Sequence, residues 1–185
     1  MAAAWEAFAR SGYEDTRTPE IAAAAEVAEG TLFLHFENKL GLLAGVMDAF
    51  YAKRLLAPAA AIAAAAPDPR ARLVALLRDY VRTLGADWRL IRAFGQRGRL
   101  YDDAFHERFK ANNRAFTRVY LDAVTELRDV GAIRADIEPR LVRDAILGAA
   151  EHYVASRLGA GLAVEPDAFT HQLLAMIFSG LEPRR

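Results

Sequence analysis

Residues 16–36 contain two short helical patterns separated by three residues, and this arrangement constrains the fold more than any other feature of the chain. Thr18 is a good N-cap and Pro19 suits the first helical position, so a helix is expected to begin there and to continue through an alanine-rich stretch. In the second pattern, Leu32 and Phe36 lie four residues apart on one helix face, toward a core. The spacing predicts a helix-turn-helix.

In a helix-turn-helix, the second helix enters the major groove of DNA, and its outward side chains are the ones that read the bases. Here the outward positions are Glu29, Gly30, Phe33 and Leu34. Two short helices around a turn of small residues also occur in helical bundles that have no role in DNA binding. The spacing alone therefore leaves both interpretations open.

The residues on either side favour the first interpretation. An amphipathic segment precedes the two helices and is expected to form a helix from about Ala2 to Arg10, and Asn38 can cap a following apolar helix. The stretch from Phe8 to Val46 resembles the N-terminal domain of the TetR family of transcriptional regulators. The residues that carry the resemblance are Phe8, Gly12, Tyr13, Thr16, Ile21, Ala22, Val27, Gly30, Thr31, Leu32, Phe33, His35, Phe36, Lys39, Leu42 and Leu43.

The resemblance implies a role in DNA binding for particular positions. Side chains of the second helix would touch bases or phosphates, and side chains at the starts of the neighbouring helices would meet the DNA backbone. The expected DNA-binding residues are Thr16, Thr18, Glu29, Gly30, Thr31, Phe33, Leu34, His35 and Lys39. Four positions depart from the family pattern. Glu26 replaces the usual turn glycine, and Ala28 stands where a capping serine or threonine is usual. Glu29 stands where lysine or arginine is common, and Phe33 lacks the hydroxyl of the frequent tyrosine.

The charge of the chain is not that of a strongly basic DNA-binding protein. The 24 basic and 24 acidic residues give a net charge of zero. Residues 1–54 contain five basic and eight acidic residues, a net charge of −3. Because DNA binding relies on cations that neutralise phosphates, this acidity favours an alternative in which the fold is kept and specific DNA binding is weak or lost.

The remaining sequence predicts an all-α protein, since apolar residues recur every three and four positions without sustained alternation. Pro58 and the sequence Pro67-Asp68-Pro69 indicate a boundary. We expect a helix-turn-helix DNA-binding domain over 1–54, which includes the start of a linking helix from Lys39 to about Leu56. A helical ligand-binding and dimerisation domain is expected over 55–185, and its first helix would be capped by Asp68.

Aromatic residues are frequent in the second of these domains, where they favour a pocket for a small hydrophobic or amphipathic ligand. The same periodicity is typical of an ordinary core. Polar residues near a bend, on the long helix and on the penultimate helix could orient a ligand. The expected ligand-binding residues are Trp88, Phe94, Arg97, Tyr101, Phe105, Phe109, Asn113, Phe116, Tyr120 and His152.

The penultimate helix has two apolar faces, which implies two packing partners. The resemblance indicates that one partner is a second copy of the chain, in a four-helix bundle built from the last two helices of each subunit. The expected dimer-interface residues are Leu141, Ala145, Gly148, His152, Ala155, Phe169, Leu173, Met176 and Ile177.

Other classes of function find little support in the sequence. The chain has no cysteine, its four histidines are far apart, and no spacing typical of a catalytic or metal site is present, so we expect no enzyme activity, no cofactor and no metal. The longest apolar run, 55–66, is shorter than the roughly 18 to 20 residues that span a membrane. A cytoplasmic location is the default expectation.

Together with these features, the resemblance implies a homodimeric transcriptional regulator. It would be a repressor that a small hydrophobic molecule releases from double-stranded operator DNA. The alternative is a dimer of the same fold that binds a ligand or a protein.

Overall fold

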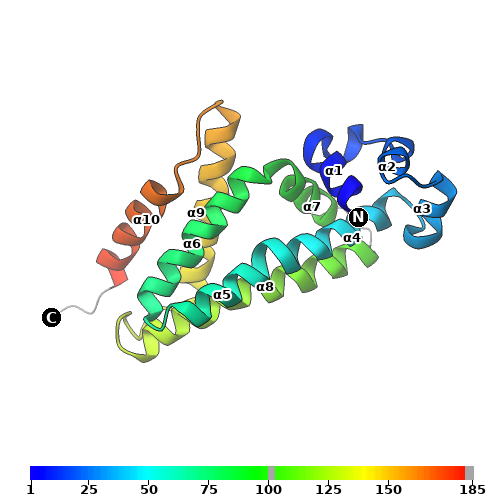
Figure 1. Ribbon diagram of the computed structural model, residues 1–185. Helices are drawn as coiled ribbons and strands as arrows, with labels where there is room; N and C mark the ends of the chain where they lie inside the picture. Colours follow the sequence, from blue (N-terminus) through cyan, green and yellow to red (C-terminus); the bar gives the residue numbers. More distant parts are fainter. Residues whose placement is uncertain (100–102, 182–185) are drawn as a thin grey trace. The chain divides into compact units, whose positions relative to one another are not determined.

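The computed structural model describes residues 1–99 and 103–181. Within these ranges every regular element is a helix (Figure 1), which confirms the predicted all-α class. The elements are α1 (Ala2–Asp15), α2 (Thr18–Ala24), α3 (Glu29–Phe36), α4 (Lys39–Phe50), a π-helical segment (Tyr51–Leu56), α5 (Ala57–Ala65), α6 (Pro69–Ala86), α7 (Trp88–Arg99), α8 (Asp103–Asp129), α9 (Pro139–Gly159) and α10 (Pro166–Leu181).

The helices form two compact units. Unit 1 contains Met1–Arg54 together with Asp87–Arg114, and unit 2 contains Leu55–Ala86 and the residues from Ala115 onward. The sequence-based division also separated residue 54 from residue 55, but it assigned residues 87–114 to the second domain. In the structure this segment packs with the N-terminal helices instead, because α7 lies along α1.

The core of unit 1 is built where α1 meets α4 and α7. Phe50 is almost fully buried, and its ring centroid lies 5.5 Å from that of Trp5 and 5.5 Å from that of Phe94. Aromatic pairs at this separation add to the stabilisation that burial of apolar area provides. Three helices that are far apart in the sequence are therefore joined by one aromatic contact chain.

The core of unit 2 is organised around α6, which packs against α5, α9 and α10 (Figure 1). The expected cap of α6 is confirmed, since the Ala71 amide donates to the Asp68 carboxylate at 2.7 Å. One face of α6 is buried, as its apolar periodicity predicts. The buried residues of this face are Leu73, Leu76, Leu77, Tyr80, Val81 and Leu84.

Two helices extend beyond the limits expected from the sequence. The linking helix was expected to end at about Leu56, but the π-helical segment leads directly into α5, where Pro58 occupies the first turn. Proline is tolerated there because a first-turn amide needs no helical partner. Similarly, α1 was expected to end near Arg10 but continues past a kink at Gly12, whose φ of 77° favours glycine.

Glu26, in the turn between α2 and α3, has a φ of 55°, in the left-handed region that a non-glycine residue adopts at a cost. We expect Glu26→Gly to raise the free energy of unfolding by about 0.5–1 kcal/mol, because glycine adopts this conformation without strain. Chemical denaturation measures the change. Ala25→Gly is the matched control, since Ala25 has right-handed helical angles and glycine there should destabilise. A loss of stability in Glu26→Gly would contradict the prediction.

Candidate functional site

The outward face of α3 is the surface that the sequence singled out for DNA recognition. Gly30, Thr31, Leu34 and His35 are exposed, whereas Leu32 is buried against the rest of unit 1. Leu34 is 84% exposed, more than any other large apolar residue in the described part of the chain. Phe33 is half-buried. The structure thus brings five of the predicted residues together on or beside one helix face.

Thr16 does not join that surface. It is only 4% exposed, and its hydroxyl donates to the carbonyl oxygens of Ala7 (3.2 Å) and Gly12 (2.5 Å). These hydrogen bonds hold the kinked end of α1. The position of Thr16 therefore corrects the expectation that it faces DNA, since its polar group is used inside unit 1.

Thr18 and Glu29 form a contact that the sequence did not reveal. The helix α2 begins at Thr18 itself, so the predicted N-cap role is wrong, and the Thr18 hydroxyl instead donates to the Glu29 carboxylate at 2.6 Å. Glu29 is also the first residue of α3, where the helix dipole favours a negative charge. A carboxylate at this position thus connects the two helices of the motif.

Lys39 begins α4, directly after Asn38, whose side chain caps the helix as predicted by accepting from the Gly41 amide at 2.8 Å. The Lys39 ammonium donates to the Glu14 carbonyl oxygen at 3.1 Å and lies 4.6 Å from the centre of the Tyr13 ring. An ammonium has three donors, so a further acceptor such as a phosphate can still bind.

Arginines from residues 87–114 form ion pairs with acidic side chains of residues 1–54, the other segment of unit 1. Arg97 pairs with Glu14, and Asp48 accepts from both Arg108 and Asn112, the latter at 2.7 Å. Residues 87–114 contain seven basic and four acidic residues, a net charge of +3 that cancels the −3 of residues 1–54. Unit 1 as a whole therefore has no net charge. Part of the negative charge of residues 1–54 is neutralised by ion pairs within the fold.

The predicted ligand-binding residues fall in both units. Tyr101 lies outside the described residues. The others divide between unit 1, which contains Trp88, Phe94, Arg97, Phe105, Phe109 and Asn113, and unit 2, which contains Phe116, Tyr120 and His152. In unit 1, Phe94 belongs to the core around Phe50, Phe109 covers Gly98, and Asn113 is exposed.

The aromatic residues of unit 2 pack against one another. The ring centroid of Tyr80 lies 4.8 Å from that of Phe116 and 6.2 Å from that of Tyr120. The Tyr120 hydroxyl donates to the Leu76 carbonyl oxygen at 2.8 Å, and burial, with a smaller effect from the Asp79 charge, raises the pKa of Tyr120 well above its usual value. The hydroxyl is therefore a protonated donor, and these rings form a core.

Sequence reasoning missed an apolar groove in unit 2, formed by α5, α6, α8 and the end of the π-helical segment. Its volume is about 380 Å³. The small side chains of α5 leave the space, so the alanine-rich run after residue 56 was the available signal. The lining residues are Leu56, Ala59, Ala60, Ala63, Arg72, Val119, Asp122 and Ala123. A mostly apolar lining with two charged groups suits a small molecule with a polar end.

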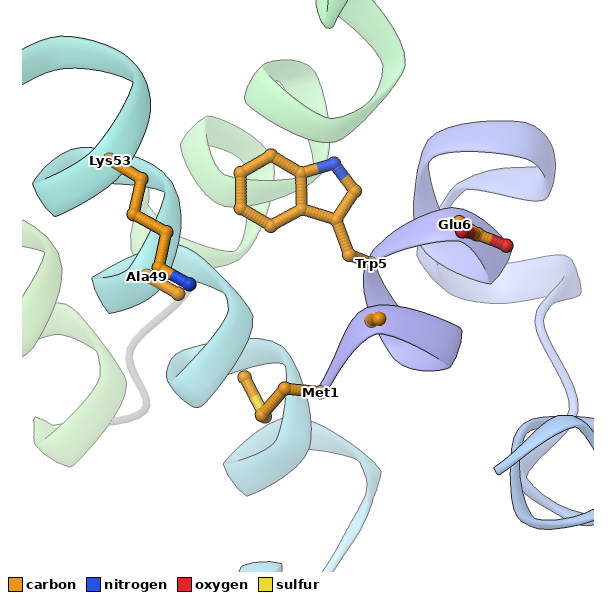
Figure 2. A pocket seen from close by; sticks show the side chains of 6 residues that line it. Met1, Trp5, Glu6, Ala49 and Lys53 are labelled. Carbon is orange, nitrogen blue, oxygen red and sulfur yellow. The ribbon is translucent and has the colours of Figure 1, made fainter. Parts of the chain in front are cut away.

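A second hollow lies in unit 1 between α1 and α4. Figure 2 shows the Trp5 indole extending from α1, with Glu6 beside it and Ala49 and Lys53 on the neighbouring helix. Its volume of about 280 Å³ is below the range of roughly 300–1,000 Å³ that is usual for ligand pockets. The groove in unit 2 is therefore the better candidate for a ligand site.

The predicted dimer-interface residues lie on α9 and α10. On α9, Leu141, Ala145, Gly148 and His152 are exposed and follow one helix face, whereas the opposite face is buried in unit 2. On α10, Met176 is 66% exposed and Leu173 is buried, while the half-buried Phe169 stacks on Tyr153 at 4.2 Å. Ala155 and Ile177 are half-buried. His152 thus lies on the exposed stripe of α9.

Two further observations concern only residues 1–99 and 103–181. No group of three or more histidine, cysteine, aspartate or glutamate side chains is arranged to hold a metal ion. No helix there has the length and apolar character needed to span a membrane.

Residues 1–46, which contain α1 to α3 and most of α4, match the family model described as bacterial regulatory proteins, tetR family. Over 181 residues the chain is 24% identical to the HTH-type transcriptional repressor DhaR of Mycobacterium sp. (strain GP1), covering 96% of this chain and 88% of that protein.

Two solved structures share the fold over nearly the whole chain. The transcriptional regulator FadR of Bacillus subtilis, in complex with stearoyl-CoA, aligns with a TM-score of 0.82 at 21% identity, over 98% of this chain and 97% of that one. The ketosteroid transcriptional regulator KstR2 of Mycobacterium tuberculosis aligns with a TM-score of 0.75 at 20% identity, over 99% and 93%. The helix-turn-helix geometry and these comparisons agree: residues 1–46 match the family model of the tetR bacterial regulatory proteins, and the chain as a whole shares its fold with two solved transcriptional regulators.

Proposed function

We propose that the protein is a ligand-responsive transcriptional repressor that binds operator DNA as a homodimer. The observation that carries this proposal is the exposed face of α3, where Gly30, Thr31 and His35 stand clear of the unit 1 core. These small and polar groups suit contacts with base edges and phosphates. The relationship to a repressor supports the direction of control.

The charge of unit 1 supports binding of moderate strength. Arg97 and Arg108 neutralise two carboxylates, and Lys39 is placed at the start of α4 with donors to spare. Glu20, Glu26 and Glu37, however, are exposed beside the motif. Few cations near the DNA imply a weak dependence of affinity on salt, because each neutralised phosphate contributes a slope of about 0.9.

The ligand, in this proposal, occupies the groove of unit 2. Acyl-CoA thioesters are the first compounds to try, because the B. subtilis regulator was solved with stearoyl-CoA and the groove has mostly apolar walls, beside an Arg72 guanidinium that is paired with Glu126. The ligand would act through α8, which supplies residues to both units.

The dimer, in this proposal, forms through the exposed stripe of α9 and the neighbouring part of α10. Ala145 and Gly148 are small enough for close approach of a second helix, and Leu141 and Met176 would bury apolar surface that the monomer exposes. A dimer presents two copies of α3. Ligand binding would change their separation, which must match successive major grooves about 34 Å apart.

One observation favours the alternative, a dimer of this fold that binds a protein through unit 1. Leu34 exposes 84% of its surface at the centre of the α3 face, with acidic residues nearby, as a protein-binding surface would. The dependence of binding affinity on salt concentration distinguishes the two functions, because only DNA binding releases condensed counterions.

For DNA binding, we expect the protein to bind a fragment from upstream of its own gene more tightly than competitor DNA. Lys39→Ala should lower affinity for every sequence and reduce the salt slope by about 0.9, while Thr31→Ala should mainly reduce discrimination. Lys110→Ala is the control, because this exposed lysine of α8 pairs with Glu107. Fluorescence anisotropy across a salt series is the measurement. A folded dimer that binds no DNA at low salt would support the alternative.

For the dimer, Ala145→Glu places a charge in the centre of the proposed interface and should weaken self-association by at least about a hundredfold, because the carboxylate would be desolvated without a partner. Arg140→Glu is the control, since Arg140 is also exposed on α9 but points away from the stripe. Sedimentation velocity over a concentration series measures the self-association constants of both variants. Equal association constants for the two variants would exclude this interface.

For the ligand, Ala60→Phe fills the groove and should lower the affinity for stearoyl-CoA by at least about tenfold, because the ring occupies space that the acyl chain needs. Ala61→Phe is the control on the adjacent position, which does not line the groove. Isothermal titration gives both affinities. If neither variant affects binding of an acyl-CoA that the wild type binds, the site lies elsewhere.

A further inference from the structure

Four side chains of unit 1 meet at the end of α1, where a tyrosine ring receives two cations. The Tyr13 ring centre lies 4.6 Å from the Lys39 ammonium and 4.2 Å from the Arg97 guanidinium carbon. Arg97 also forms an ion pair with the Glu14 carboxylate, and Lys39 donates to the Glu14 backbone carbonyl. The end of α1, the start of α4 and the end of α7 are therefore joined in one cluster.

The backbone fixes the place of this cluster. The kink at Gly12, with its φ of 77°, redirects the last residues of α1, and the buried Thr16 hydroxyl bonds back to the Gly12 carbonyl. Tyr13 and Glu14 are thus held between α4 and α7. Lys39 cannot reach the Glu14 carbonyl unless this turn keeps its position.

The Glu14 carboxylate could interfere with phosphate binding by Lys39. Its side chain is 76% exposed, next to the ammonium expected to bind a phosphate, whereas the Arg97 side chain is 27% exposed. Without Arg97, an unpaired carboxylate would attract the Lys39 ammonium and repel a phosphate. With Arg97 in place, Glu14 is neutralised, and the contacts of the Lys39 ammonium in the described part of the chain are with a carbonyl and a ring face.

We propose that Arg97 is a positioning residue for DNA binding, which neutralises Glu14 and orders Tyr13 so that Lys39 remains available to a DNA phosphate. This inference rests on the proposed function. It gives α7 an indirect part in DNA binding, through Lys39. Because ion pairs at exposed positions contribute little to folding stability, the effect of Arg97 belongs to binding rather than to folding.

A double-mutant cycle on Arg97 and Glu14 tests whether Arg97 affects DNA affinity through Glu14. Arg97→Gln should weaken affinity for all DNA sequences about fivefold, the effect of one uncompensated charge at contact distance in water. Glu14→Gln in the same chain should restore affinity to within about twofold of the wild type, and Arg97→Lys should lose less than Arg97→Gln. If the double variant stays as weak as Arg97→Gln and its salt slope falls by about 0.9, Arg97 binds phosphate directly and the proposal is overturned.

The matched control is Arg108→Gln, which breaks the ion pair with Asp48 in the same unit. Asp48 lies nine residues after Lys39 on α4, or about 13 Å along the helix axis, beyond the screening length of roughly 8–10 Å in physiological salt. DNA affinity should therefore stay unchanged. Equal losses in Arg97→Gln and Arg108→Gln would indicate a general charge effect and would overturn the positioning role.

A second measurement needs no DNA. Competitive acetylation followed by mass spectrometry should show slower modification of Lys39 in Arg97→Gln than in the wild type, because the freed Glu14 carboxylate pairs with the ammonium. Glu14→Gln in the same chain should restore the rate. Unchanged Lys39 reactivity in Arg97→Gln would overturn the positioning role. Altered reactivity in a protein that binds no DNA would keep that role and instead refute the proposed function.

Discussion

The contact between Phe50 and Phe94 determines how the N-terminal unit is assembled. These two rings bring α7 against α4, although more than forty residues separate them in the chain. Arg97 of α7 then pairs with Glu14 of α1, and Arg108 at the start of α8 pairs with Asp48 of α4. Residues 87–114 as a whole cancel the acidic excess of residues 1–54. A hydrophobic contact thus sets the electrostatic character of the surface that carries the helix-turn-helix.

The helix-turn-helix is held by polar contacts that differ from those implied by the family resemblance. Glu29 accepts from Thr18, so a carboxylate on the first turn of the recognition helix connects it to its neighbour. This contact keeps the geometry of the motif at the expense of one charge of the wrong sign for DNA. The outward face of α3 has the apolar Leu34 at its centre. It is therefore less polar than a surface that contacts only phosphates would be.

Local signals in the sequence predicted most of the fold. Asn38 and Asp68 cap helices because their side chains reach nearby amides, and such contacts need only a few residues of chain. The outward positions of α3 followed from helical periodicity in the same way. The helix-turn-helix and the apolar stripe of α9 could therefore be predicted from the sequence alone.

The remaining features depend on contacts between distant residues. Thr16 was expected at the surface, but the kink at Gly12 turns its hydroxyl toward α1. Residues 87–114 were placed in the second domain because nothing local shows that Phe94 packs on Phe50. The aromatic residues predicted to bind one ligand serve two separate cores, since periodicity alone cannot distinguish a pocket lining from a packed interior.

The alanine-rich helix α5 has a consequence for how this protein could diversify. Alanine has the highest intrinsic helix propensity, so α5 owes less of its stability to particular packing contacts than helices with larger side chains do. Substitutions along its groove-facing side can therefore accumulate without loss of the fold. Each one would reshape the wall by a few atoms, so duplicated copies of the gene could acquire different ligand preferences one mutation at a time.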